Sequence, residues 1–177
     1  LTPAGIPAMY WFATNLGKYG LAKDLIELLA NKDMIFGVMT RAKALRPDYF
    51  YHAPDRYLGA YFTKVPFPKG DLPRSLQHFQ LTMRGNRDYF ATYVLVAQMY
   101  ALKIKDRIPA DAKWCKLGAP TDPKATQHPC RRMFSRLLKH VIAADPKVLP
   151  KIEAEQRVEQ RKAKLLLEEL DTFFPKD

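Results

Sequence analysis

Apolar residues recur three and four positions apart along almost the whole chain, and the strict alternation typical of strands is nearly absent. Residues 7–31 follow this helical spacing, with Gly17 and Gly20 as the points where the helix bends or divides. Asp33 is expected to cap a second helix, which ends near Leu45 because a proline follows closely. The N-terminal part is therefore predicted to be helical.

The same periodicity continues to the C-terminus. Asp55 and Asp88 are expected to cap the helices that follow them. The residues after Asp88 are apolar nearly all round, which predicts a central helix, and their 14-residue apolar run is too short to span a bilayer. The further predicted helices cover residues 56–65, 72–84, 89–107, 130–145 and 150–174. The pattern indicates an all-α fold of about seven helices.

Pairs of these helices share a weak internal repeat of the tetratricopeptide kind. The first copy has Leu58-Gly59 and Phe62 on one helix, then Ser75 and Phe79 on the next. The glycine would let the two helices approach closely. A second copy carries the large residues Tyr93, Tyr100, Phe134 and Leu138, and Pro47 ends a third half-copy at the position that Pro146 has in the second. The repeat favours stacked antiparallel helical hairpins over a generic bundle, with a concave face for binding.

Length and charge add two expectations. A chain of 177 residues that is 47% hydrophobic is expected to form a single domain, 1–177, around one core. The net charge is +11, of which +7 falls within residues 103–140, so an acidic partner is expected there, with ordinary solubilising charge as the alternative. The predicted basic, partner-binding surface comprises Lys103, Lys105, Arg107, Lys113, Lys116, Arg131, Arg132, Arg136 and Lys139.

The only two cysteines, Cys115 and Cys130, flank a proline-rich stretch without apolar periodicity. We interpret it as a loop insertion at about 108–130 that a Cys115–Cys130 disulfide closes in an oxidising compartment. A zinc site with His128 and His140 is the alternative, although the two close ligand pairs of a structural site are missing. Copper bound by Cys130 and Met133 is a weaker alternative. The absence of CxxC excludes c-type haem and thioredoxin-like chemistry.

Few signals favour an enzyme or a cofactor. The four histidines are scattered, and neither a GxSxG nucleophile motif nor a phosphate-binding glycine loop occurs. We therefore predict a non-enzymatic protein without cofactors. Nucleic-acid binding is the competing interpretation of a basic chain, but the acidic C-terminal part and the lack of a known motif argue against it.

Three segments, "HAPDRYLGAYFTKVPFPKGDLPRSLQHF" (52–79), "DYFATYVLVAQMYALKIKDR" (88–107) and "VEQRKAKLLLEELDTFF" (158–174), resemble the T-component proteins associated with TRAP transporters. The resemblance implies an all-helical periplasmic protein with degenerate tetratricopeptide-like repeats that forms a homotrimer and contacts a solute-binding partner. The sequence departs from the family at Ala53, where glycine is usual, and in the inserted segment.

The resemblance also implies an apolar ligand or channel role but no catalytic residues. Tyr57, Tyr61, Phe62, Tyr93 and Tyr100 would then line a concave pocket, with packed core as the alternative for each. The predicted function is a periplasmic protein-binding scaffold. The alternative is an accessory subunit of a larger acidic periplasmic complex, such as a redox enzyme. The sequence does not begin with methionine, so either a leader has been removed or the given sequence starts late, and a lipid anchor stays open.

Overall fold

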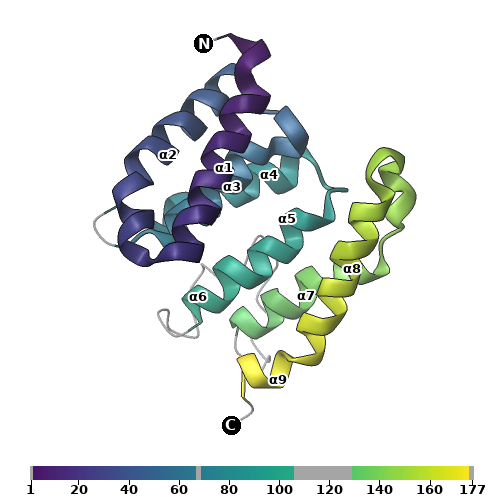
Figure 1. The fold of residues 1–177 in the computed structure, drawn as a ribbon. Helices are drawn as coiled ribbons and strands as arrows, with labels where there is room; N and C mark the ends of the chain where they lie inside the picture. The colour runs from purple at the N-terminus through teal and green to yellow at the C-terminus, as the bar shows by residue number, and fades with distance from the viewer. Residues whose placement is uncertain (1, 67–68, 106–128, 176–177) are drawn as a thin grey trace. The chain divides into compact units, whose positions relative to one another are not determined.

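The computed structural model describes residues 2–66, 69–105 and 129–175 (Figure 1). These residues form helices joined by turns, with no strand among them, so the predicted all-α class is confirmed. They group into two compact units, Leu1–Asn86 and Arg87–Asp177, each treated by itself below. The single domain over 1–177 stays a prediction.

Unit 1 begins with a helical hairpin formed by α1 (Ile6–Lys23) and α2 (Leu25–Leu45), which pack side by side (Figure 1). The division near Gly20 was predicted, and a Cβ there would lie 2.8 Å from the Cα of Leu28, so only glycine allows this approach. The predicted cap was wrong. Asp24 caps α2 by accepting a hydrogen bond from the Glu27 amide, whereas Asp33 lies inside the helix.

Helix α3 (Tyr49–Lys64) starts earlier than predicted, and Asp55 lies within it rather than at its cap. The first turn is irregular because Phe50, Tyr51 and His52 all have positive φ, between 44° and 58°. Left-handed backbone is costly for residues with a Cβ. The Arg56 guanidinium compensates by donating to the carbonyl oxygens of Tyr51 (2.8 Å) and Phe50 (3.4 Å).

Helix α4 (Leu72–Gly85) begins after Asp71, whose side chain accepts a hydrogen bond from the Arg74 amide, and it packs against α3. The close approach predicted at Gly59 is present: a Cβ there would lie 2.8 Å from the Phe79 ring. Beside it, the Ser75 hydroxyl donates to the Gly59 carbonyl and pairs with the Thr63 hydroxyl. The hairpin follows the predicted pattern, while its tetratricopeptide character stays a prediction.

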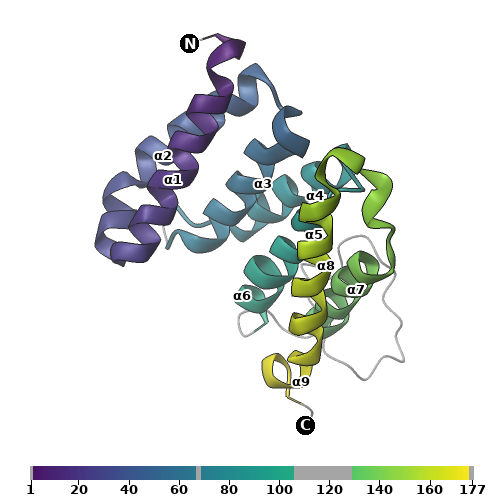
Figure 2. The same cartoon turned by 45° about the vertical axis from the view of Figure 1, so that its right-hand side comes forward.

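Unit 2 begins with one long helical stretch, in which α5 (Phe90–Leu95) passes through a π-helical segment (Val96–Ala101) into α6 (Leu102–Ile104). After the insertion come α7 (Pro129–Ala143) and α8 (Glu153–Glu168), which pack against each other (Figure 2). The single C-terminal helix predicted over 150–174 is interrupted. Short 3-10 turns precede α8, and α9 (Leu170–Phe173) follows a break at Glu169.

Two glutamines of α8 form hydrogen bonds with backbone groups at the ends of neighbouring helices. The Gln156 side chain is fully buried, accepts from the Phe90 amide (3.1 Å) and donates to the Asp88 carbonyl (2.6 Å) at the start of α5. The Gln160 amide donates to carbonyl oxygens at the end of α7, including that of Ala144 at 2.8 Å. Because helix ends leave backbone groups without intrahelical partners, these side chains fix the register of α5, α7 and α8.

Candidate functional site

Helix α7 has one apolar and one cationic face. Met133, Phe134, Leu138 and Val141 are buried in unit 2, whereas the opposite face consists of polar, basic and small side chains. The helix contains no acidic residue. The outward side chains are Arg132, Ser135, Arg136, Lys139 and His140, of which Arg136, Lys139 and His140 are exposed. α7 therefore concentrates positive charge on one side.

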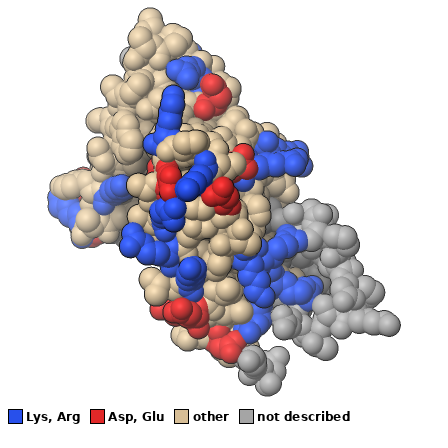
Figure 3. Space-filling view, turned by 90° about the vertical axis from the view of Figure 1, so that its right-hand side faces the viewer, with Lys and Arg blue, Asp and Glu red and all other residues tan. Residues whose placement is uncertain are grey.

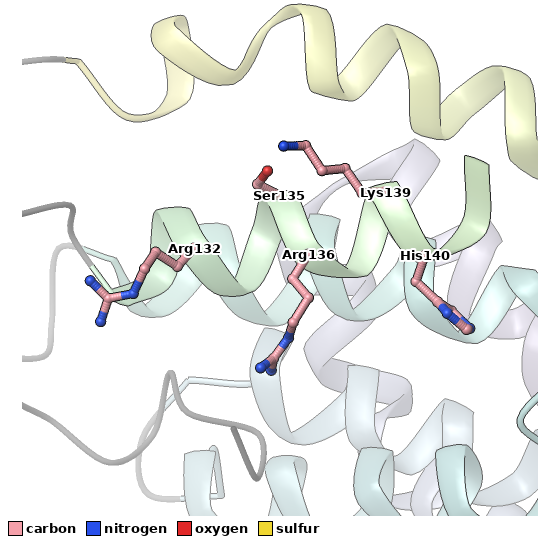
Figure 4. A pocket seen from close by; sticks show the side chains of 5 residues that line it. All are labelled: Arg132, Ser135, Arg136, Lys139 and His140. Atoms are coloured by element: carbon pink, nitrogen blue, oxygen red, sulfur yellow. The ribbon is translucent and has the colours of Figure 1, made fainter. Parts of the chain in front are cut away.

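These five side chains line an open pocket of about 520 Å³ (Figure 4). Arg132, Arg136 and His140 extend to one side of α7 in Figure 4, and Ser135 and Lys139 extend to the other. In Figure 3, Lys and Arg side chains gather on one part of the visible face without an acidic side chain among them. Such a surface attracts anionic groups and repels cationic ones.

His140 is positioned by an aromatic neighbour from α5. The ring centroids of Tyr93 and His140 lie 4.5 Å apart, tilted by 48°. Burial, with a further contribution from Asp88 that outweighs the opposing one from Arg87, raises the pKa of Tyr93. The phenol therefore stays neutral at physiological pH, and Tyr93 supports the His140 ring without adding charge to the pocket.

The other predicted surface cations separate into three groups. Lys103 is exposed on α6. Lys105 and Arg131 instead bind the C-terminal segment: Lys105 Nζ donates to the Phe173 carbonyl (2.5 Å), and Arg131 donates to the Phe174 carbonyl (2.5 Å) and pairs with Asp171. Arg131 is only 9% exposed, so it is a structural residue rather than part of the outer surface. The remaining three, Arg107, Lys113 and Lys116, lie outside the described residues.

Only one of the two cysteines in the predicted disulfide lies among the described residues. Cys130 is fully buried in the first turn of α7, whereas Cys115 lies outside the described residues together with most of the insertion, 108–128. The disulfide therefore stays a prediction. His128 of the alternative metal set lies outside as well, and within residues 2–66, 69–105 and 129–175 no group of three or more metal-binding side chains occurs.

The aromatic residues predicted for a ligand pocket are packed. Tyr61 and Phe62 are buried in the core of unit 1, and Tyr57 packs against that core, its hydroxyl donating to the Ala13 carbonyl at 3.2 Å. Burial, with smaller contributions from Tyr10 and Tyr61, raises the pKa of Tyr57 to about 12. In unit 2, Tyr100 is fully buried, which raises its pKa too, and Tyr93 is half-buried under His140. Their placement fits the core alternative.

A buried polar centre in unit 1 was missed by the sequence reasoning. The Asp55 carboxylate lies 2.7 Å from Lys43 Nζ and 2.6 Å from His78 Nδ1, and the His78 ring stacks on Phe62. Burial by itself would raise the pKa of Asp55, but the hydrogen bonds from His78 and Lys43 outweigh it and lower the pKa. The "PDR" triplet was the available signal, yet its partners lie on other helices. The contacts join α2, α3 and α4.

One comparison with known proteins agrees with the family resemblance. The sequence model of a family described as TRAP transporter T-component matches residues 1–113. That range includes all of unit 1 and the α5–α6 stretch, while α7, α8 and both cysteines follow it. No curated protein matches the chain. Among the described residues, no helix is long and apolar enough to cross a membrane.

Proposed function

Because the chain belongs to the TRAP transporter T-component family, we propose that it is a periplasmic, non-enzymatic scaffold that docks on a protein partner of the transporter through the cationic face of α7. The family is a transporter-associated component rather than an enzyme family. The partner in this proposal is the solute-binding subunit, which would contact α7 through an acidic surface of its own. Homotrimer formation belongs to the same proposal.

One observation carries the docking surface: five outward side chains of a single helix form a pocket without a carboxylate on that helix. Charges at the rim of an interface contribute mainly to the association rate and to orientation. A partner with an acidic patch would be steered towards α7, and the salt dependence of association would report that steering.

An apolar ligand is a weaker part of the proposal. Tyr61, Phe62 and Tyr100 are each at most 7% exposed, so a ligand among them would have to displace packed rings. Protein docking needs no such rearrangement because Arg136, Lys139 and His140 are exposed already. For this reason the docking role, and not ligand transport, is the proposed main function.

A second function is favoured by one specific observation. The family match ends at residue 113, so α7 and its cations lie outside the matched residues. A surface added to the family scaffold would suit an accessory subunit of another, larger acidic periplasmic complex. Both functions use the same face and differ only in the partner.

The association rate with the purified solute-binding subunit tests the first function. Reversing charge in the double variant Arg136→Glu/Lys139→Glu should slow association several-fold and flatten its dependence on salt. The double variant Lys147→Glu/Lys151→Glu makes the same charge change at two exposed residues outside the pocket and should associate more nearly like the wild type.

Two other results would redirect the proposal. If the wild-type chain does not bind the solute-binding subunit but co-purifies with a large acidic complex, the accessory function takes its place. If both double variants associate equally fast, α7 is not the docking face. Light scattering on the isolated protein measures the oligomeric state separately, with a trimer as the expected result.

A further inference from the structure

The middle of helix α1 directs its large apolar side chains outward and its small ones inward. Along residues 11–20 the buried positions are Ala13, Thr14, Gly17 and Gly20. Trp11, Phe12 and Tyr19 are instead 45%, 51% and 51% exposed. A helix that only served the core of unit 1 would bury its aromatic residues. This stretch of α1 therefore presents three aromatic rings to the outside.

The three rings lie on one face of the helix. Successive residues of an α-helix are about 100° apart, which places Trp11, Phe12 and Tyr19 within an arc of about 100°. Among the described residues, six of the ten large exposed apolar side chains lie on the α1–α2 hairpin: Trp11, Phe12, Tyr19, Leu21, Ile26 and Met34. Such a concentration of exposed apolar residues marks an interaction surface.

Trp11 is oriented by aromatic neighbours at its base. Its ring centroid lies 5.2 Å from that of Tyr10, in an edge contact, and 6.1 Å from that of Phe50. Tyr10 belongs to the buried core of unit 1, so the indole is supported from within the unit while nearly half of it is exposed. Because its orientation is set already, little side-chain entropy is lost when it is bound.

The charge around this face distinguishes between possible partners. Residues 1–23 contain no Asp or Glu. Lys18 is exposed two turns after Trp11 on the same side of α1, and Lys23 Nζ lies 5.5 Å from the centre of the Tyr19 ring and 3.4 Å from Glu27. A second copy packed through the same face would bring like charges together. An anionic surface would be complementary to the lysines.

Aromatic rings beside lysines, on a helix without carboxylates, are typical of helices that lie in the headgroup region of a membrane. Trp and Tyr prefer this region because one end of each side chain is apolar and the other is polar. Lys side chains extend their ammonium groups from there to lipid phosphates.

We propose that the α1 face formed by Trp11, Phe12 and Tyr19 binds the surface of an anionic lipid bilayer, with the rings among the headgroups and Lys18 and Lys23 at the phosphates. The helix lies along the surface in this arrangement and does not span the bilayer. The inference goes beyond the proposed docking function and does not depend on it, since α1 belongs to unit 1 and α7 to unit 2.

The test measures flotation of the full chain at low salt with mixed phosphatidylcholine and phosphatidylglycerol vesicles, and with vesicles of phosphatidylcholine alone. We expect the wild type to partition preferentially onto the anionic vesicles. Phe12→Ser/Tyr19→Ser should lower this partition coefficient about tenfold, because it removes two apolar groups from the contact. Leu81→Ser/Leu165→Ser removes two exposed apolar side chains from α4 and α8 and should leave it nearly unchanged. Circular dichroism checks that each variant is folded.

Two further variants test the charge and the position of the indole. Lys18→Glu should weaken binding to the anionic vesicles about fivefold or more, with a smaller effect on phosphatidylcholine vesicles. Trp114→Phe leaves Trp11 as the only tryptophan, and its emission should shift to shorter wavelength when anionic vesicles are added.

Absence of wild-type flotation with the anionic vesicles would overturn the inference. Equal flotation of Phe12→Ser/Tyr19→Ser and its control pair would overturn it as well. If the vesicles bind neither protein and Phe12→Ser/Tyr19→Ser abolishes a wild-type oligomer in light scattering, a second copy covers the face instead. Arg136→Glu/Lys139→Glu should float like the wild type. If it loses flotation as strongly as the α1 variant, the cations of α7 hold the vesicle and the assignment to α1 is wrong.

Discussion

The Asp55 carboxylate, 4% exposed, lies 2.6 Å from Nδ1 of His78, and this contact ties the middle of α3 to the middle of α4. The same oxygen is 2.7 Å from Nζ of Lys43, which brings α2 into the connection. A buried carboxylate is tolerable only when it is paired and hydrogen-bonded. The three side chains therefore form a buried polar cluster that joins α2, α3 and α4 in unit 1.

Removing the carboxylate should destabilise unit 1 strongly. Asp55→Ala leaves His78 and Lys43 without their shared acceptor, and we expect a loss of about 3 kcal/mol in the free energy of urea unfolding. Asp48→Ala is the matched control. Its carboxylate is 66% exposed and pairs only with exposed Arg46, so about 0.5 kcal/mol or less is expected. Equal effects in the two variants would contradict a stabilising role of this polar cluster.

The polar cluster around Asp55 also predicts a dependence of stability on pH. The pKa of Asp55 is lowered in the folded protein from its usual 3.8 because the hydrogen bonds to His78 and Lys43 outweigh burial. A lowered folded-state pKa means that the stabilisation is fully present above the unfolded pKa and is lost as pH falls through the folded one. Thermal unfolding of wild type and Asp55→Ala should therefore differ most near neutral pH and converge below about pH 4.

The glycine contact between α3 and α4 makes a packing prediction. Gly59→Ala would place a methyl group 2.8 Å from the Phe79 ring and should cost about 1–3 kcal/mol of unfolding free energy. Phe79→Leu, although destabilising alone, should reduce the cost of Gly59→Ala when the two are combined in a double-mutant cycle. Gly37→Ala is the control. Gly37 is exposed within α2 with open space around it, so alanine there should stabilise by about 0.5–1 kcal/mol.

The cap that α8 supplies to α5 can be tested amide by amide. Gln156→Leu keeps the buried volume but removes both hydrogen bonds to the start of α5, at a cost of about 2–3 kcal/mol. Hydrogen exchange at the Phe90 amide should accelerate more than exchange elsewhere in α5. Gln98→Leu, at an exposed position of the same unit, should change neither quantity appreciably. An unchanged Phe90 exchange rate would show that the cap is not stabilising.

Arg131 is predicted to act in stability and not in docking. Arg131→Met removes the hydrogen bond to the Phe174 carbonyl and the pair with Asp171, so unfolding free energy should fall by about 2–3 kcal/mol and exchange over residues 170–174 should accelerate. Lys139→Met should behave in the opposite way, with little effect on stability and slower partner association. If Arg131→Met slows association as much as Lys139→Met does, Arg131 belongs to the docking surface after all.

Much of the fold was predictable because helices are encoded locally. Apolar spacing predicted the helical segments, and Gly59 predicted the contact of α3 with α4. The caps were less predictable. Asp24 and Asp33 are equally good capping residues in isolation, and only the close contact of Gly20 with Leu28 decides that the chain turns at Asp24.

The candidate site was predictable in its charge and not in its geometry. The sequence placed +7 of the net charge of +11 within residues 103–140, because charge is a property of the residues themselves. Arg131 and Arg132 are indistinguishable in the sequence, yet Arg131 is 9% exposed and bound to the C-terminal segment, while Arg132 lines the pocket on α7. The helix period separates them by about 100°, and the packing of α7 determines which of them faces inward.

The sequence by itself therefore determined the helical class, the family and the location of the positive charge, since each follows from local periodicity, residue matches or composition. Only the tertiary structure decided that Asp55, His78 and Lys43 meet, that Gln156 caps α5, and that Arg131 is structural. These relationships join residues 12 to 68 positions apart. They arise when helices pack, because burial requires each polar group to find a partner wherever the fold brings one.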